Sequence, residues 1–216
     1  MDAFPMFPLG AVLLPGELLS LQVFEPRYLV MIEECTAYPD RMSFGVVLIS
    51  RGQEVGGGDE RTAIGTAARI VSARPVAGGR LLLDCEGTQR IRVERWLADA
   101  PYPRAEVAPW PDERSAIGDG VIGLLDDRVA ELGEVYGELA RRRGLSAPVF
   151  PALGELPGDA AAQTYGLASR LPLGPADRLR VLSAPGVGAR LEVLADTVED
   201  VLAAARFRLS GLETGR

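Results

Sequence analysis

Hydrophobic and polar positions alternate along several short stretches in the first half of the chain. The segment 64–70, IGTAARI, is one example. A period of two places one face of a strand in a core and the other face in water. Ala77-Gly78-Gly79 and Gly87-Thr88 are predicted to form turns between such strands. The expected strands cover residues 18–24, 44–49, 64–70, 79–85, 89–93 and 102–110.

One helix is predicted among these strands, from Pro26 to about Thr36. Its apolar side chains recur at helical spacing, for example at Tyr28, Ile32 and Cys35. Proline lacks an N–H group, so it suits the first turn of a helix, where that donor has no intrahelical partner. Many short strands with one early helix are typical of a small, partly closed β-barrel.

The periodicity becomes helical after the proline-rich segment 109–113. Ser115 is a candidate N-cap for a long first helix, and the glycines within this helix predict a frayed start. We therefore expect an α+β chain with two domains, a β-barrel at residues 1–113 and a helical bundle at residues 114–216. The expected helices cover residues 115–143, 159–171, 175–183 and 187–209.

An ordered series of motifs carries a family resemblance. The series consists of FPLGAVLLPGELLSLQVFEPRY at residues 7–28, FGVVLI at residues 44–49 and IGTAARI at residues 64–70. It resembles the N-terminal, substrate-binding domain of the Lon protease family, and it is most similar to stand-alone bacterial proteins that carry this domain without the motor. The segments 171–182 and 190–194 are similar to the helical tail of Lon N-terminal regions.

This resemblance implies a pseudo-β-barrel of the PUA-like type and a protein that recognises substrate polypeptides. The implied partners are unfolded or extended polypeptide segments, and they could include a separate protease or chaperone. In full-length Lon proteases the helical tail leads into an ATPase and a peptidase. The sequence stops at Arg216, and we expect neither activity from it.

The composition removes most catalytic chemistries. The chain has no histidine and no lysine, so all 23 of its basic residues are arginines. Without histidine there is no Ser-His or Cys-His pair, and without lysine there is no Schiff base, P-loop or Ser-Lys dyad. Cys35 and Cys85 are expected to be buried core thiols rather than nucleophiles. We therefore expect no enzyme, no catalytic residue, no cofactor and no metal site.

Charge and hydropathy restrict the partners and the compartment. A net charge of −7 argues against nucleic acid, because nucleic-acid binders usually present a basic face. No apolar run approaches about 18 residues, so no membrane span is expected. The N-terminus carries Asp2 and no basic residue, which argues against a secretory signal. Two widely separated cysteines are typical of a reduced, cytoplasmic protein.

Apolar side chains gather around the turn at Pro15-Gly16. Either they cap the barrel, or they line a groove that accepts an unfolded apolar segment. The Glu25-Pro26-Arg27 junction is likewise either a structural corner or part of a binding site. The family resemblance favours the groove. The candidate peptide-binding residues are Leu13, Leu14, Leu18, Leu19, Phe24, Arg27 and Tyr28.

RNA binding is the alternative function, since PUA-like barrels are often RNA modules. Arg69, Arg90 and Arg92 are the residues that would carry it, if they lie on one polar face of the sheet. Cross-strand ion pairs with neighbouring acids are the simpler account of these arginines.

An enzyme that relies on carboxylates and arginine alone is the third hypothesis, and it needs a converging acid pair. Asp84 and Glu86 share a strand face, where they could bind a cation or form a solvated surface. The glycine-rich loop at residues 51–61 lacks the order of a phosphate-binding motif, although it could close over a bound peptide. The leading hypothesis is a non-catalytic polypeptide-binding protein.

Overall fold

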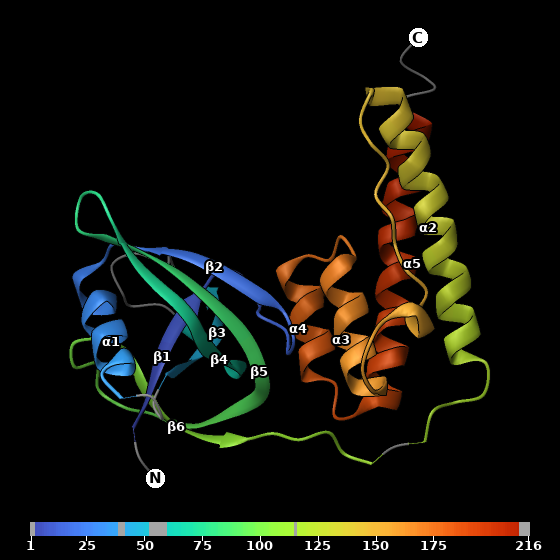
Figure 1. Cartoon of the computed structure of the whole chain (residues 1–216). Helices are drawn as coiled ribbons and strands as arrows, with labels where there is room; N and C mark the ends of the chain where they lie inside the picture. Colours follow the sequence, from blue (N-terminus) through green and yellow to red (C-terminus); the bar gives the residue numbers. More distant parts are fainter. Residues whose placement is uncertain (1–2, 39–41, 52–59, 115, 212–216) are drawn as a thin grey trace. The chain divides into compact units, whose positions relative to one another are not determined.

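The computed structural model describes residues 3–38, 42–51, 60–114 and 116–211 (Figure 1). The chain forms two compact units, Met1–Pro111 and Asp112–Arg216, where the sequence placed a boundary after residue 113. The first unit holds the strands and one helix, and the second holds the remaining helices. The predicted α+β class is therefore confirmed. Among the described residues, no helix combines the length and the hydrophobicity needed to cross a bilayer.

A six-stranded sheet forms the first unit, in the order β2-β5-β4-β3-β1-β6. Helix α1 spans Pro26–Thr36, as the sequence predicted. The strands are β1 (Phe4–Leu9), β2 (Leu18–Val23), β3 (Ser43–Arg51), β4 (Glu60–Val76), β5 (Arg80–Trp96) and β6 (Arg104–Pro109).

The two halves of β5 have different neighbours. Its first half pairs with β2, from Leu81 to Glu86, and its second half pairs with β6, from Ile91 to Trp96. Because β6 also pairs with β1, the strands β5-β4-β3-β1-β6 close into a ring at one end of the sheet. At the other end the ring is open between β1 and β2, which have no pairing with each other in the described residues. This arrangement agrees with the partly closed barrel expected from the sequence.

Helix α1 packs against the core of the first unit with Tyr28, Met31, Ile32 and Cys35, all of them buried. The ring of Tyr28 stacks on Phe7 of β1, with centroids 4.0 Å apart and planes inclined by 7°. The helix thus completes the core that the strands alone leave uncovered.

The predicted turn at Gly87-Thr88 is wrong, because β5 runs without interruption from Arg80 to Trp96. Gly87 serves a different purpose. A Cβ atom at this position would lie 2.4 Å from the carbonyl oxygen of Leu14, so only glycine allows this backbone to approach so closely. The other predicted turn is confirmed, since Gly78 and Gly79 adopt positive φ angles between β4 and β5.

Replacing Gly87 by alanine should lower the free energy of unfolding by about 1–3 kcal/mol, the usual range for overpacking. The clash is with backbone, which cannot rotate away as a side chain can. Gly123→Ala is the control, because a Cβ atom added there meets nothing within 4 Å and helix α2 (Val121–Arg143) should gain up to about 1 kcal/mol. Urea denaturation would measure both. A Gly87→Ala protein as stable as the parent would contradict the close approach.

Helices α2 and α5 lie side by side in the second unit and run in the same direction (Figure 1). Arg128 of α2 contacts Glu199 of α5 at 2.9 Å, and Glu131 pairs further along with Arg206. The other elements are η2 (Leu153–Glu155), α3 (Ala160–Arg170), α4 (Pro175–Ser183) and α5 (Val187–Gly211).

The start of α2 differs from the prediction. The helix begins at Val121 rather than near residue 115, because Gly120 has a φ of 77° and ends the preceding segment. Ser115, the predicted N-cap, lies outside the described residues.

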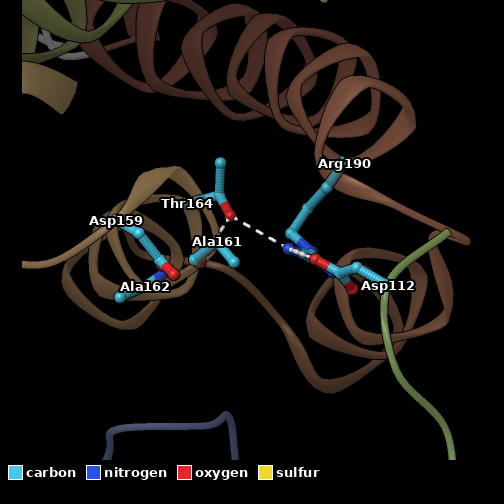
Figure 2. A network of polar contacts seen from close by, with 6 residues as sticks. All are labelled: Asp112, Asp159, Ala161, Ala162, Thr164 and Arg190. Atoms are coloured by element: carbon cyan, nitrogen blue, oxygen red, sulfur yellow. Dashed lines mark hydrogen bonds and ion pairs between the residues drawn. The ribbon is translucent and has the colours of Figure 1, made fainter. Parts of the chain in front are cut away.

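A buried arginine on α5, Arg190, contacts both Asp112 at the start of the second unit and helix α3 (Figure 2). The side chain of Arg190 on α5 is fully buried and donates to both carboxylate oxygens of Asp112, with Nη1 3.0 Å from Oδ2. Nη1 also lies 3.2 Å from the hydroxyl of Thr164 on α3, and the guanidinium carbon lies 3.9 Å from the ring centroid of Tyr165. One side chain therefore connects two helices and the first residue of the unit.

Candidate functional site

The candidate binding residues fall into two groups in the structure. Leu13, Leu14 and Tyr28 are buried, with at most 4% of their surface exposed. Leu18 and Phe24 are 76% and 55% exposed. Leu19 and Arg27 are half-buried.

Leu13 and Leu14 cap the barrel, which was the other interpretation of this apolar segment. The hydroxyl of Thr66 donates to the carbonyl of Leu13 at 2.6 Å, and Gly16 N–H donates to the carbonyl of Gly87 at 2.7 Å. These bonds hold the segment against β4 and β5, with its leucines turned inward. As placed, the two side chains offer no surface to a partner, which corrects our expectation that they line a groove.

The junction between β2 and α1 has the geometry of a structural corner. Arg27 pairs with Glu25 at 3.0 Å, and its guanidinium carbon lies 4.6 Å from the ring centroid of Tyr28. Phe24 immediately before this corner is turned to the outside. The corner therefore presents one large exposed aromatic side chain.

A small pocket lies beside this corner, at the open end of the sheet between β1 and β2. Its volume is about 100 Å³. This is well below the roughly 300–1,000 Å³ of sites for cofactors and drug-sized ligands. The lining consists of Phe7 and Leu9 from β1, residues 21–25, and Tyr28.

Five of these lining residues were missed in the sequence, namely Phe7, Leu9, Leu21, Gln22 and Val23. Phe7 and Leu9 belong to β1, which was not predicted because Pro5 and Pro8 interrupt its pattern. Leu21, Gln22 and Val23 belong to a predicted strand, and the burial along β2 shows that Leu21 and Val23 share its inward face.

The cysteines do not form a reactive centre. Burial raises the pKa of the Cys35 thiol to about 11, with a smaller contribution from Glu34. Burial raises the pKa of the Cys85 thiol to about 12, and Asp84 adds to this. Both thiols are free and buried, as predicted, so they stay protonated and are poor nucleophiles at neutral pH.

The raised thiol pKa values predict a loss of stability at high pH. Thiols of the unfolded chain ionise near their ordinary pKa of 9.0, whereas the folded thiols hold their protons until about pH 11 and 12. Stability from this source is therefore complete below pH 9 and declines as the pH rises through the folded values. Urea denaturation at pH 7 and pH 10 would show the decline, which should be smaller in a Cys85→Ala protein. Stability that rises over this interval would contradict the assignment.

Asp84 and Glu86 share the outer face of β5, as predicted, but each is engaged by neighbours. Asp84 accepts hydrogen bonds from Ser20 at 2.7 Å and Ser72 at 2.8 Å, and these bonds lower its pKa. Glu86 pairs with Arg69 on β4. No group of three or more metal-ligating side chains occurs in the described part of the chain. The loop at residues 52–59 lies outside the described residues.

The three sheet arginines do not form an open basic face. Arg69 pairs with Glu86, and Arg90 is 4% exposed. Arg90 and Arg92 both stack against Trp110, with their guanidinium carbons 4.3 and 4.5 Å from the ring centroid. Each of the three arginines thus contacts an acid or an aromatic ring of the protein itself.

The fold is that of Lon N-terminal domains. A crystal structure of a Lon N-terminal domain protein from Xanthomonas campestris matches 90% of this chain and 97% of its own length, with a TM-score of 0.63 and 31% identity. The N-terminal domain of the Mycobacterium avium complex Lon protease matches 92% of this chain and 99% of its own length, with a TM-score of 0.59. At 19% identity, this second match supports the fold alone.

The chain belongs to the ATP-dependent protease La (Lon) substrate-binding domain family, whose model matches residues 3–200. The Lon protease of Desulforamulus reducens is 28% identical over 197 residues, which make up 91% of this chain and 24% of that protein. Lon protease 2 of Myxococcus xanthus is 32% identical over 117 residues, or 53% of this chain and 14% of that protein. The chain thus spans at most a quarter of the length of these relatives.

Proposed function

We propose that this protein binds extended, apolar polypeptide segments and carries out no chemistry on them. The observation that carries the proposal is the small pocket at the open end of the sheet, whose lining is mainly apolar and includes the exposed side chain of Phe24. A pocket that accepts one side chain, next to an exposed aromatic, suits a peptide better than a cofactor. Family membership supports the same substrate class.

The chemistry of the described residues also favours binding without catalysis. The buried thiols stay protonated, and the acids on the sheet are held by serine and arginine neighbours. Histidine and lysine do not occur in the sequence. A binding protein needs none of these groups, whereas acyl transfer or hydrolysis would need an activated nucleophile or an acid–base pair.

A peptide array would test the selectivity directly. Overlapping segments of a large protein would be immobilised and probed with the purified chain. Apolar segments should bind the chain, whereas acidic segments should not, because the chain itself has a charge of −7. A folded acidic protein of similar size is the control probe. If the array retained this chain and the acidic control protein equally, the proposal would be refuted. It would also be refuted if rising salt alone removed the bound chain, because such salt dependence is typical of nucleic-acid-type interactions.

A further inference from the structure

Strand β2 has a free edge along its whole length in the described residues. It pairs with β5 from Leu18 to Val23 with no shift of register, and no other described strand pairs with it. Its backbone amide and carbonyl groups on the far side therefore face outward, where they can pair with another extended chain.

This edge lacks the features by which proteins usually protect such edges. Exposed edge strands commonly carry a charge, a proline or a bulge that prevents pairing with another chain. The sequence of β2, LLSLQV, has no charged residue and no proline, and its ladder with β5 has no bulge. On the opposite side of the opening, β1 contains Pro5 and Pro8, which cannot donate hydrogen bonds. The opening thus has one side suited to pairing and one side that resists it.

The pocket lies along this same edge. Leu21, Gln22 and Val23 of β2 form part of its lining. Leu19 and Leu21 face inward and belong to the margin of the core, yet both remain only half-buried. An added strand would cover them and would place every second side chain of its own on the inward face, next to the pocket.

A second copy of the chain fits this edge less well than a peptide does. Each copy carries a charge of −7, and β2 is followed and preceded by the acids Glu25 and Glu17. If two β2 strands paired antiparallel, Glu17 of each copy would lie near Glu25 of the other. Arg27 is the positive charge near these acids, so the two copies would repel each other at both ends of the pairing. A flat pairing of edges would also leave the pocket empty, whereas one side chain of a guest peptide can enter it.

We propose that β2 accepts an extended, non-acidic apolar peptide as an additional strand, with one aliphatic or aromatic side chain of the peptide in the pocket. This inference rests on the proposed function and adds the mode of binding, which is main-chain pairing with one side-chain anchor. The guest would span about five or six residues, the usual length of a strand.

The ladder shows which groups of β2 take part. Gly87 N–H donates to the carbonyl of Glu17 at 2.9 Å, so Glu17 and Gly87 form a hydrogen-bonded pair. In an antiparallel ladder, hydrogen-bonded and non-hydrogen-bonded pairs alternate, so every second residue of β2 after Glu17 bonds to β5. With the unshifted register, the N–H groups of Leu18, Ser20 and Gln22 point away from β5. Proline at one of these positions removes a donor for the guest without breaking a bond to β5.

The test compares Gln22→Pro with Gln22→Ala, using a fluorescent peptide of about six residues that alternates valine and serine. Both substitutions remove the same side chain, but only proline removes the outward N–H. Because Gln22 lines the pocket, Gln22→Ala is the reference for the lost side chain, and Gln22→Pro should bind about tenfold more weakly than Gln22→Ala, since one backbone hydrogen bond is lost. The same peptide with N-methyl groups on alternate amides should lose affinity for the parent protein to a similar extent.

Each other outcome overturns the inference. If Gln22→Pro and Gln22→Ala bind equally while Phe24→Ser abolishes binding, the peptide is bound but not as a strand. If the parent does not bind the peptide at all, the proposed function fails with it. If Gln22→Pro instead converts a dimer to a monomer in sedimentation, the edge serves a second copy. Should Gln22→Pro fail to fold, as judged by circular dichroism, the N-methylated peptide alone decides, and unchanged affinity for it rejects the strand.

Discussion

Replacing Asp112 by alanine lowers the free energy of unfolding of the helical unit by about 3–5 kcal/mol, the usual cost of leaving a buried charge without its partner. Arg190 is fully buried and has Asp112 as its only carboxylate partner in the described residues. Thr164 and Tyr165 remain beside it, but a hydroxyl and an aromatic ring do not neutralise a buried guanidinium.

Two controls separate this effect from a general loss of ion pairs. Glu131→Ala breaks the exposed pair with Arg206 and should cost less than about 1 kcal/mol. The double change Asp112→Ala with Arg190→Met removes the charge together with its partner, so it should recover part of the stability lost in Asp112→Ala. Urea denaturation followed by helical circular dichroism measures all three. An Asp112→Ala protein as stable as Glu131→Ala would show that Arg190 does not depend on this carboxylate.

Replacing Phe24 by serine weakens binding of an apolar peptide about 30-fold. Phe24 is the large exposed aromatic at the pocket, and a buried aromatic anchor in an interface commonly contributes about 2 kcal/mol or more. The side chain is 55% exposed in the free protein, so its loss should change the stability by no more than about 0.5 kcal/mol. Affinity and stability should therefore respond separately.

Phe207→Ser is the matched control for this change. Phe207 is also an exposed phenylalanine, at 80%, but it lies on α5 of the second unit and outside the pocket. Fluorescence anisotropy with the labelled peptide should give an unchanged affinity for Phe207→Ser. Equal losses in both variants would indicate nonspecific apolar contact, and no loss in either would place the peptide elsewhere.

Local rules predicted most helix boundaries. Helix α1 starts at Pro26 and α4 at Pro175, as expected for proline in a first turn. Helix α3 starts after Asp159, whose side chain accepts from Ala162 N–H as an N-cap. These features depend on neighbouring residues, so one sequence suffices to identify them.

The strands were harder to predict because their limits depend on distant parts of the chain. Strand β1 contains two prolines and is stabilised by β3 and β6, about 40 and 100 residues further along. Gly87 suggested a turn, but its role is the close approach of the Leu14 backbone. In both cases contacts with distant parts of the chain determine the conformation, and local propensity alone predicts the wrong one.

The site was only partly predictable for the same reason. The sequence indicated the region from Leu13 to Tyr28, but which leucines face inward depends on how that segment crosses β4 and β5. The pocket needs β1, β2 and α1 together. The pairing of Arg190 with Asp112 joins residues 78 positions apart, a distance over which a single sequence carries no signal.

The most direct test of the account is a titration of the purified chain with one labelled polypeptide in two states, folded and permanently unfolded by reduction and alkylation of its cysteines. We predict saturable binding of the unfolded form, weakened by Phe24→Ser and unchanged by Phe207→Ser, with no measurable binding of the folded form. Equal affinity for the two forms, or chemical conversion of the polypeptide during the titration, would contradict a protein that binds extended chains without acting on them.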